Sequence, residues 1–306
     1  MLSVIICSYN PRAAFLERTL SALERQSVRQ SQWELLLVDN NSNPALSLDR
    51  VRWHSRARII REEQQGLTHA RLRGIEESSG ELLVFVDDDN ILESNYLASV
   101  LDVAGSYPFL GAFGGSIEGE FEISLPVWFH QYQSWVGVKP ISSAFWSNHA
   151  LDGKSTPIGA GMVLKRAVAE KYLSYNRKKP LRQVLDRCGD DLLGGGDIDM
   201  ALTACDIGLG KGVFPELKML HLIPSERMTL NYMERLLEGC HHSRVILNYI
   251  RDLPIQKPWS KPSWKRRLLN RYLERDIPDY HKRLSEAANR GVLKGRKQLK
   301  DLGLLS

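Results

Sequence analysis

Three short apolar runs, each followed at once by a cluster of polar side chains, constrain the fold of this chain more than any other feature of its sequence. The runs are Leu2–Cys7, Glu34–Val38 and Glu81–Val86. Uninterrupted apolar runs of this length are typical of strands that are buried on both faces of a parallel sheet. The sequence therefore predicts that these strands form the centre of an α/β domain.

The segments between these strands carry the pattern of helices. Apolar residues recur at helical spacing from Phe15 to Leu23, and residues 66–77 indicate a second helix, preceded by a short strand at Ala57–Ile60. Strands that alternate with helices form βαβ units, whose crossovers are right-handed. With 306 residues the chain fits one large domain or a domain with an appendage.

The polar clusters follow the strands directly, at Ser8-Tyr9-Asn10, Asp39-Asn40-Asn41 and Asp87-Asp88-Asp89. Because ligands of parallel sheets bind at the carboxyl ends of the strands, we expect all three clusters to line one edge. Adjacent carboxylates repel one another and raise one another's pKa unless a cation offsets them. The acidic triplet therefore predicts a hard metal ion, with a solvated loop as the alternative.

The composition excludes several classes of protein. Apolar residues at 43% and charged residues at 25% argue against wholesale disorder. No run approaches the roughly 18 apolar residues of a membrane span, and the N-terminal MLSVIICSYNPR lacks the basic region of a signal peptide. The four cysteines form no CxxC pair, which favours thiols in a reducing compartment over zinc or disulfides. We expect a cytoplasmic protein.

The positive charge is concentrated at the C-terminal end. Residues 251–306 hold fifteen Lys and Arg against six Asp and Glu, a net charge of +9, whereas the whole chain carries +5. A basic tail on a nearly neutral body indicates an acidic partner, such as membrane phosphates, a polyphosphate or a nucleic acid.

The motifs at the strand ends resemble a known family. The segments SVIICSYNPR, LLLVDNNS, QQGLTHARLRGI and VFVDDDN, in this order, are similar to the nucleotide-binding half of family 2 glycosyltransferases with the GT-A fold. In the second half, Thr156–Lys165 resembles the strand under the acceptor site, and GGGDIDM (Gly194–Met200) resembles the family's G-E-D-x-[DE]-[LM] motif. The likeness covers roughly residues 1–250.

The resemblance implies a Rossmann-like GT-A architecture: a mostly parallel central sheet flanked by helices, with a helical basic extension at the C-terminus. It divides the chain into a glycosyltransferase domain over 1–250, with a nucleotide-binding half (1–110) and an acceptor half (111–250), and the extension over 251–306. It also implies an inverting transfer of a sugar from a UDP-sugar, or a related nucleotide-sugar, to a hydroxyl of a glycan or lipid-linked acceptor.

The same resemblance assigns the nucleotide-sugar contacts. Tyr9 packs against the uracil, with Ser8 and Asn10 beside it, although a tyrosine packed under a loop is the alternative. Asp39 accepts a hydrogen bond from the ring N–H, or instead caps a turn. Arg71 then pairs with the diphosphate, and one carboxylate, Asp87 or Asp88, contacts the ribose or the donor sugar.

A metal ion and a general base complete the implied site. Asp89, in a DXD-like motif, ligates Mn²⁺ or Mg²⁺, and His221, placed after a predicted strand at Lys218–Leu220, either completes the metal shell or is structural. Asp197 is the candidate base that takes the proton of the acceptor hydroxyl. The chain departs from the family at Gly196, where the usual residue is Glu, and Asp199 is a partial substitute that points away from Asp197.

The tail leaves two interpretations open. Trp259 and Trp264, followed by a basic stretch with Leu268, Leu269, Tyr272 and Leu273 on one face, are typical of a helix that lies on anionic lipid, or else of one packed on the body. The alternative to a transferase is a non-catalytic protein that binds nucleic acid or another anionic surface through this tail. We expect no nucleic acid, because the acidic strand ends would repel phosphates in the absence of metal.

Overall fold

The computed structural model describes residues 1–259 and 278–305. Its strands are β1 (Leu2–Ser8), β2 (Trp33–Asp39), β3 (Ala57–Arg61), β4 (Leu82–Asp87), β5 (Asn90–Leu92), β6 (Leu110–Phe121), β7 (Phe145–Ser147), β8 (Val163–Lys165) and β9 (Gly210–Ile223). Its α-helices are α1 (Ala13–Glu24), α2 (Leu67–Glu77), α3 (Tyr96–Ser106), α4 (Arg166–Lys178), α5 (Gly196–Asp206), α6 (Leu230–Ile250) and α8 (Asp279–Asp301). Short 3₁₀ segments are η1 (Gln30–Gln32), η2 (Leu48–Val51), η3 (Val127–Val136), η4 (Pro180–Val184) and η5 (Ser225–Met228).

The strands form one mixed sheet in the order β3-β2-β1-β4-β8-β6-β9-β5, with β7 paired to β9. Strands β3, β2, β1 and β4 are mutually parallel, and β6 and β9 run the same way beyond the antiparallel β8. The sheet is therefore mostly parallel, as predicted. The carboxyl ends of β1, β2 and β4 meet at one edge, which is where the polar clusters lie.

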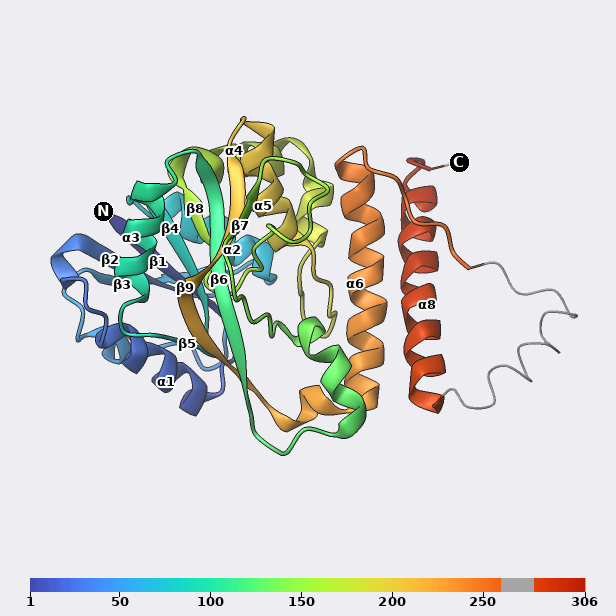
Figure 1. Ribbon diagram of the computed structural model, residues 1–306, viewed down its shortest axis with the longest axis horizontal. Helices are drawn as coiled ribbons and strands as arrows, with labels where there is room; N and C mark the ends of the chain where they lie inside the picture. The colour runs from blue at the N-terminus through green and yellow to red at the C-terminus, as the bar shows by residue number, and fades with distance from the viewer. Residues whose placement is uncertain (260–277, 306) are drawn as a thin grey trace, which may run out of the picture.

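Helices cover both faces of the sheet (Figure 1). Alternate strand residues such as Ile6 and Leu37 pack on α1 and α3, whereas Ile5 and Leu36 pack on α2, α4 and α5. Because successive side chains of a strand point to opposite faces, a strand between two helical layers is apolar at nearly every position. This requirement explains the uninterrupted apolar runs of the sequence.

Most of the predicted elements are confirmed, and two are wrong in extent. The strand predicted over Thr156–Lys165 is reduced to β8, because Gly161 takes a left-handed φ of 69° and the chain before it is a loop. The strand predicted over Lys218–Leu220 continues to Ile223, so that His221 lies inside β9 rather than after it. There His221 pairs with Asn90 of β5.

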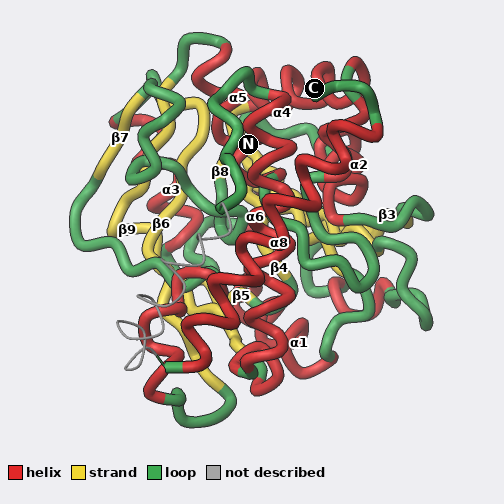
Figure 2. The backbone as a smooth tube through the Cα atoms, turned by 90° about the vertical axis from the view of Figure 1, so that its right-hand side faces the viewer, coloured by secondary structure: helices red, strands yellow, loops and turns green. Residues whose placement is uncertain are grey.

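The helices α6 and α8 pack side by side, and α6 lies between α8 and the rest of the domain (Figures 1 and 2). Gly291 of α8 lies so close to α6 that a Cβ there would meet the Glu238 carbonyl oxygen at 2.1 Å. Arg283 pairs with Glu234, and Arg290 with Glu238, across the same seam. Part of the basic charge of the C-terminal segment thus holds α8 to α6.

The C-terminal extension is helical over α8, as expected. The predicted face of Leu268, Leu269, Tyr272 and Leu273, together with Trp264, lies outside the described residues. Over residues 1–259 and 278–305, no helix combines the length and the apolar character needed to cross a membrane.

Candidate active site

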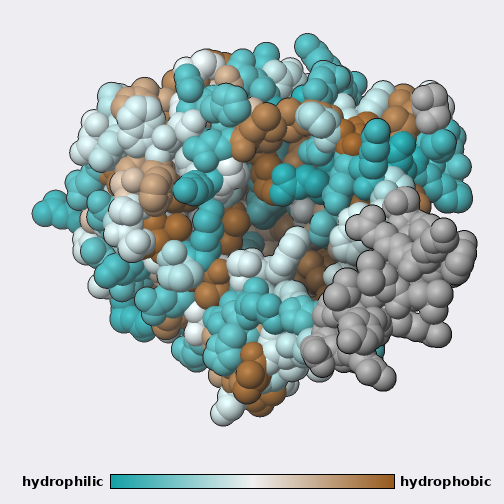
Figure 3. All heavy atoms as spheres, turned by 45° about the vertical axis from the view of Figure 1, so that its right-hand side comes forward, coloured by the Kyte–Doolittle hydropathy of each residue, from teal (hydrophilic) through white to brown (hydrophobic). Residues whose placement is uncertain are grey.

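A cavity of about 950 Å³ opens at the carboxyl edge of β1 and β4 and extends toward α6. Figure 3 shows a hollow near the middle of this side of the molecule, where hydrophilic and hydrophobic side chains meet. All but one of the predicted site residues line the cavity: Ser8, Tyr9, Asn10, Arg71, Asp87, Asp88, Asp89, Asp197 and His221. Residues from five separate stretches of the sequence therefore line one cavity.

The loop after β1 forms one wall of the cavity. The buried Ser8 hydroxyl donates a hydrogen bond to Asp88 Oδ2, and Tyr9, 44% exposed, is free to meet a planar ligand. Asn10 has a positive φ of 45° and accepts a hydrogen bond from the Asn43 amide through its side chain. The turn chemistry of this loop thus fixes the backbone and leaves the tyrosine ring exposed.

Asp39 is the predicted residue that the structure does not bring to the cavity. Its carboxylate is buried and accepts hydrogen bonds from the amides of Ser42 and Leu46 and from Arg61 Nη1, at 2.9, 3.1 and 2.7 Å. Burial acts to raise the pKa of Asp39, but these hydrogen bonds outweigh it and hold the pKa below its usual value. Asp39 therefore organises the turn after β2, the alternative open at the sequence level, and the neighbouring Asn40 lines the cavity instead.

The three carboxyl groups of the acidic triplet at the end of β4 differ in the direction in which their pKa values are shifted. Burial, with Asp89 close by, raises the pKa of Asp88 to about 7 and also raises the pKa of Asp87. Burial pushes the pKa of Asp89 in the same direction, but His221 and Arg227 outweigh it and hold that pKa far below its usual value. Asp89 is therefore the carboxylate of the triplet whose surroundings favour the ionised form most strongly.

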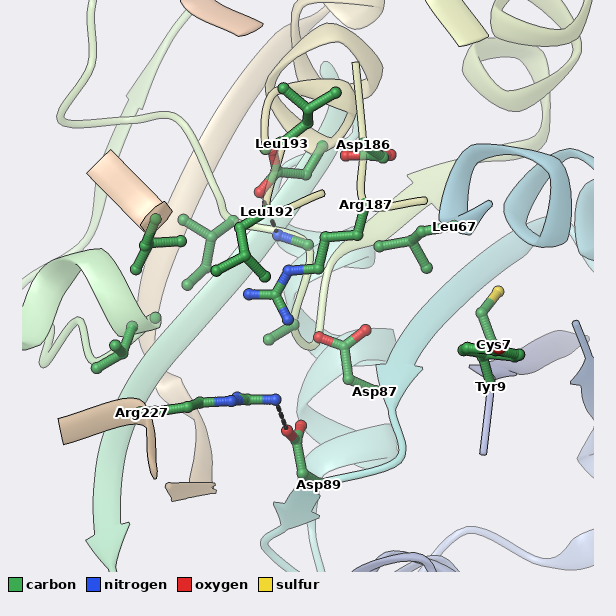
Figure 4. A pocket seen from close by; sticks show the side chains of 18 of the residues that line it. Cys7, Tyr9, Leu67, Asp87, Asp89, Asp186, Arg187, Leu192, Leu193 and Arg227 are labelled. Atoms are coloured by element: carbon green, nitrogen blue, oxygen red, sulfur yellow. Dashed lines mark hydrogen bonds and ion pairs between the residues drawn. The ribbon is translucent and has the colours of Figure 1, made fainter. Parts of the chain in front are cut away.

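The Asp89 carboxylate contacts two nitrogen groups from other elements. His221 Nε2 lies 3.3 Å from Asp89 Oδ2, and Arg227 Nη2 lies 3.1 Å from the same oxygen. Arg227 follows β9 in η5, and its guanidinium also lies 3.2 Å from His221 Nε2. Figure 4 shows Arg187 and Arg227 extending toward Asp87 and Asp89. Two arginine side chains therefore bring positive charge close to the acidic residues at the end of β4.

Asp197 lies in the first turn of α5, across the cavity from the triplet. Its Oδ2 accepts a hydrogen bond from the Gly159 amide at 2.9 Å, and its Oδ1 accepts one from the Ile198 amide at 2.7 Å. Each oxygen keeps a lone pair beyond these bonds. The half-buried carboxylate is thereby fixed in direction and still able to accept a proton from a bound molecule.

Asp199 has a different role. Its fully buried carboxylate pairs with Arg182 and with Arg251 Nε, both within 2.6 Å, so that it faces away from the cavity. Asp190 and Asp191 are exposed on the loop before α5, as expected of loop charges.

Residues 3–173, more than half of the chain, match the model of glycosyl transferase family 2. The chain belongs to this family. This membership favours the transferase interpretation over that of a nucleic-acid-binding protein, and the strand-end motifs on which the resemblance depends lie within the matched residues.

Named relatives match parts of this family 2 chain. Glycosyltransferase AglE of Haloferax volcanii is 40% identical over 93 residues, which are 29% of this chain and 30% of AglE, so the chain spans less than a third of that relative. An Escherichia coli protein named UDP-Glc:alpha-D-GlcNAc-diphosphoundecaprenol beta-1,3-glucosyltransferase WfgD is 23% identical, over 62% of this chain and 86% of its own length.

Among solved structures, S. aureus TarS 1-349 in complex with UDP-GlcNAc aligns with 99% of the chain and 83% of its own, at a TM-score of 0.54 and 13% identity. At this identity the likeness shows a shared fold. It agrees with the GT-A architecture predicted from the sequence.

The metal-coordinating side chains of this family 2 chain fit a divalent cation only if substrate phosphates or water supply further ligands. Among the residues described, no group of three or more His, Cys, Asp and Glu side chains is placed to hold a metal ion by itself. His221 Nε2 lies 3.3 Å from Asp89 Oδ2, so one nitrogen and one oxygen are close enough to bind the same ion. His221 Nδ1 is buried beside Gly137 and has no hydrogen-bond partner in the described part of the chain. Mg²⁺ sites often pair one or two protein ligands with substrate phosphates and water, and the arrangement fits that class.

Three residues of the site were missed by the sequence analysis: Asp186, Arg187 and Arg227. Asp186, 6% exposed, pairs with Arg71 Nη1 at 2.9 Å, so the guanidinium predicted to face a diphosphate is bound on one side by this carboxylate. Asp186 and Arg187 lie in the irregular segment before α5, and Arg227 lies in the short 3₁₀ segment η5, where neither periodicity nor motif spacing marks them. The polar Ser225-Glu226-Arg227 cluster after a strand was the one available signal.

Proposed function

We propose that the chain is an inverting, metal-assisted glycosyltransferase that moves a sugar from a UDP-sugar, or a related nucleotide-sugar, to a hydroxyl group of a glycan or lipid-linked acceptor. The observation that carries this proposal is the convergence of Tyr9, the acidic triplet and Asp197 on one cavity. Its volume of about 950 Å³ is at the upper end of ligand sites, which suits a donor and part of an acceptor together.

The donor fits the edge formed by β1 and β4. Tyr9 offers an aromatic face for a pyrimidine ring, and Asn40 lines the same cavity with its side-chain amide bound to the backbone of Glu62, Gln64 and Gly66. Arg187 and Arg227 supply positive charge for a diphosphate, to which guanidinium groups bind bidentately. The TarS structure with UDP-GlcNAc supports a UDP-sugar in this fold.

The reaction requires one carboxylate on the acceptor side. The acceptor oxygen attacks the anomeric carbon, the bond from that carbon to the diphosphate oxygen breaks, and its electron pair leaves with UDP. Asp197 receives the proton of the acceptor hydroxyl, and the amides of Gly159 and Ile198 hold its carboxylate in place for this transfer.

Asp89 and His221 are the residues that would hold Mn²⁺ or Mg²⁺ together with the diphosphate. Such an ion, when bound, neutralises the charge that develops on the leaving UDP. Arg227 faces the same Asp89 oxygen and offers a second positive charge to that leaving group.

The acceptor side of the cavity is lined by side chains of η3, the loop before α5, and α6. They include the apolar Trp135, Leu193 and Leu236 and the basic Arg244. A wall of this kind suits an acceptor with both apolar and anionic parts, and the name of the relative WfgD describes a diphosphate-linked lipid acceptor.

We also propose peripheral contact with an anionic membrane on the cytoplasmic side, through α8. Lys282 and Lys300 are exposed and are 18 residues apart, which is five helical turns, so they lie on one face. The test is salt-dependent sedimentation with anionic liposomes, in which Lys282→Glu/Lys300→Glu should lower the bound fraction. Binding that does not change would leave α8 with its packing role alone.

The experiment that tests the function is a UDP-release assay over a panel of UDP-sugars with Mn²⁺. Release that depends on an added acceptor, and that is lost in EDTA, supports a metal-assisted transferase. Salt-sensitive binding to oligonucleotides without any UDP release would instead support the anionic-surface alternative.

A further inference from the structure

The carboxylate of Asp186 occupies the space of the side chain that Gly196 lacks. A Cβ built on Gly196 would lie 2.1 Å from Asp186 Oδ2 and 2.5 Å from Asp186 Cγ, far inside van der Waals contact. Gly196 is the first residue of α5 and is not among the glycines with a positive φ, so the backbone does not demand glycine there. Glycine is required because Asp186 fills the position.

Asp186 joins two helices that carry site residues. Its Oδ2 accepts hydrogen bonds from Thr68 Oγ1 at 3.0 Å and from Arg71 Nη1 at 2.9 Å, both on α2. Its Oδ1 accepts one from the Gly196 amide at 3.0 Å, at the N-terminus of α5. Negative charge at a helix N-terminus is stabilising, so this carboxylate suits its position electrostatically.

The Arg71 guanidinium, which Asp186 binds, also interacts electrostatically with the carboxylates of Asp87 and Asp197. Arg71 is 4% exposed, and Asp186, Asp87 and Asp197 all raise its pKa, although burial opposes them. A Cβ at Gly159 would lie 2.4 Å from Arg71 Nη2 and 3.2 Å from Asp197 Cβ, so Arg71 and Asp197 pack against the same glycine. A displacement of the Arg71 side chain would therefore change the packing and the electrostatic surroundings of Asp197.

We propose that Asp186 is a positioning residue: from the loop before α5 it supplies the carboxylate that position 196 cannot, and it keeps the Arg71 guanidinium from pairing with Asp197. Without Asp186, the carboxylates that still stabilise the buried cation are those of Asp87 and Asp197. An ion pair between Arg71 and Asp197 would turn that carboxylate away from an acceptor and occupy its free lone pair. The inference rests on the proposed function of Asp197 as the base.

The test moves the carboxylate from one position to the other. Asp186→Asn keeps the shape of the side chain and removes its charge, so kcat should fall at least about tenfold while the KM for the donor changes little, since small displacements at a reacting group cost up to about 10²-fold. In Asp186→Ala, adding Gly196→Glu restores a carboxylate to the same space. Its matched control is Asp186→Ala with Gly196→Gln, which has the same size and no charge.

We expect the Glu double variant to exceed both Asp186→Ala and the Gln control in kcat by about tenfold, a coupling that is ordinary for residues in contact. Equal kcat for the Glu and Gln variants, or normal kcat in Asp186→Asn, would overturn the inference. Circular dichroism and UDP binding confirm that each variant is folded.

Failure of the proposed function is a separate outcome, in which the wild-type chain transfers sugar from no donor. The inference is then decided by thermal unfolding. Gly196→Ala should lower Tm in the wild type, where its Cβ meets Asp186, and should leave Tm unchanged in Asp186→Ala. Equal losses in both backgrounds would contradict the shared position.

Discussion

Replacement of Asp197 by Asn tests the central chemical assignment. The substitution keeps the size of the side chain and removes its ability to accept a proton. Positioned proton transfer is worth about 10²–10⁴-fold in rate, which corresponds to about 2.7–5.5 kcal/mol of transition-state stabilisation. Because a general base acts mainly in the transition state, we expect kcat to fall by this factor while UDP affinity is unchanged.

The hydrogen bonds around Asp197 also predict that Asp197→Asn lowers the stability of the protein. Both of its oxygens accept backbone N–H groups, from Gly159 and Ile198, and the amide nitrogen of Asn must face one of these donors. One hydrogen bond to a charged acceptor is then lost, which costs about 1.5–3 kcal/mol. The variant should therefore unfold at a lower temperature but remain folded under assay conditions.

The assay measures acceptor-dependent UDP release beside UDP binding by calorimetry. Asp190→Asn is the matched control, because it makes the same chemical change on an exposed loop near the same helix. Hydrolysis of the donor by water should fall less than transfer, since water can lose its proton to solvent. Near-normal transfer in Asp197→Asn, or an equal collapse of UDP binding, would refute the assignment of Asp197 as base.

Three further predictions follow from the same structure. Asp89→Ala should abolish Mn²⁺-dependent UDP binding with no loss of fold, and UDP release that survives in EDTA would contradict metal assistance. Asp199→Asn should cost roughly 3–5 kcal/mol of stability, because it leaves Arg182 and Arg251 without their buried carboxylate partner. The kcat of the folded protein should be retained, and thermal unfolding together with kcat checks both expectations. A loss of kcat without a loss of stability would assign the role of general base to Asp199. Gly291→Ala should lower Tm, since its Cβ would meet the Glu238 carbonyl oxygen, whereas Gly105→Ala in α3, where nothing lies within 4 Å, should not; equal Tm values for the two would contradict the close packing of α6 on α8.

The sequence by itself determined the sheet and the edge at which the site lies. Strands covered on both faces are apolar at nearly every position. Inside β1 and β2 the exceptions are Ser3 and Glu34, which are buried and hydrogen-bonded to each other, and the polar residue that ends each of β1, β2 and β4 marks the carboxyl edge. Burial of a strand on both faces can be predicted from the apolar residues of a short segment. The parallel direction of the strands follows from their alternation with helices along the chain. The placement of Ser8, the acidic triplet and Asp197 around one cavity followed from these local rules and the family motifs.

Only the tertiary structure decided how the side chains at that edge pair with one another. Asp39 and Asn40 are adjacent in sequence, yet Asp39 binds the turn amides and Arg61 away from the cavity, whereas Asn40 binds the backbone of residues 62–66 at the cavity wall. Asp186 shares its position with Gly196, ten residues away, through a loop that has no regular pattern. Hydrogen bonds and ion pairs depend on distances of a few tenths of an ångström between elements that the chain order does not make neighbours, and packing of the whole fold sets those distances.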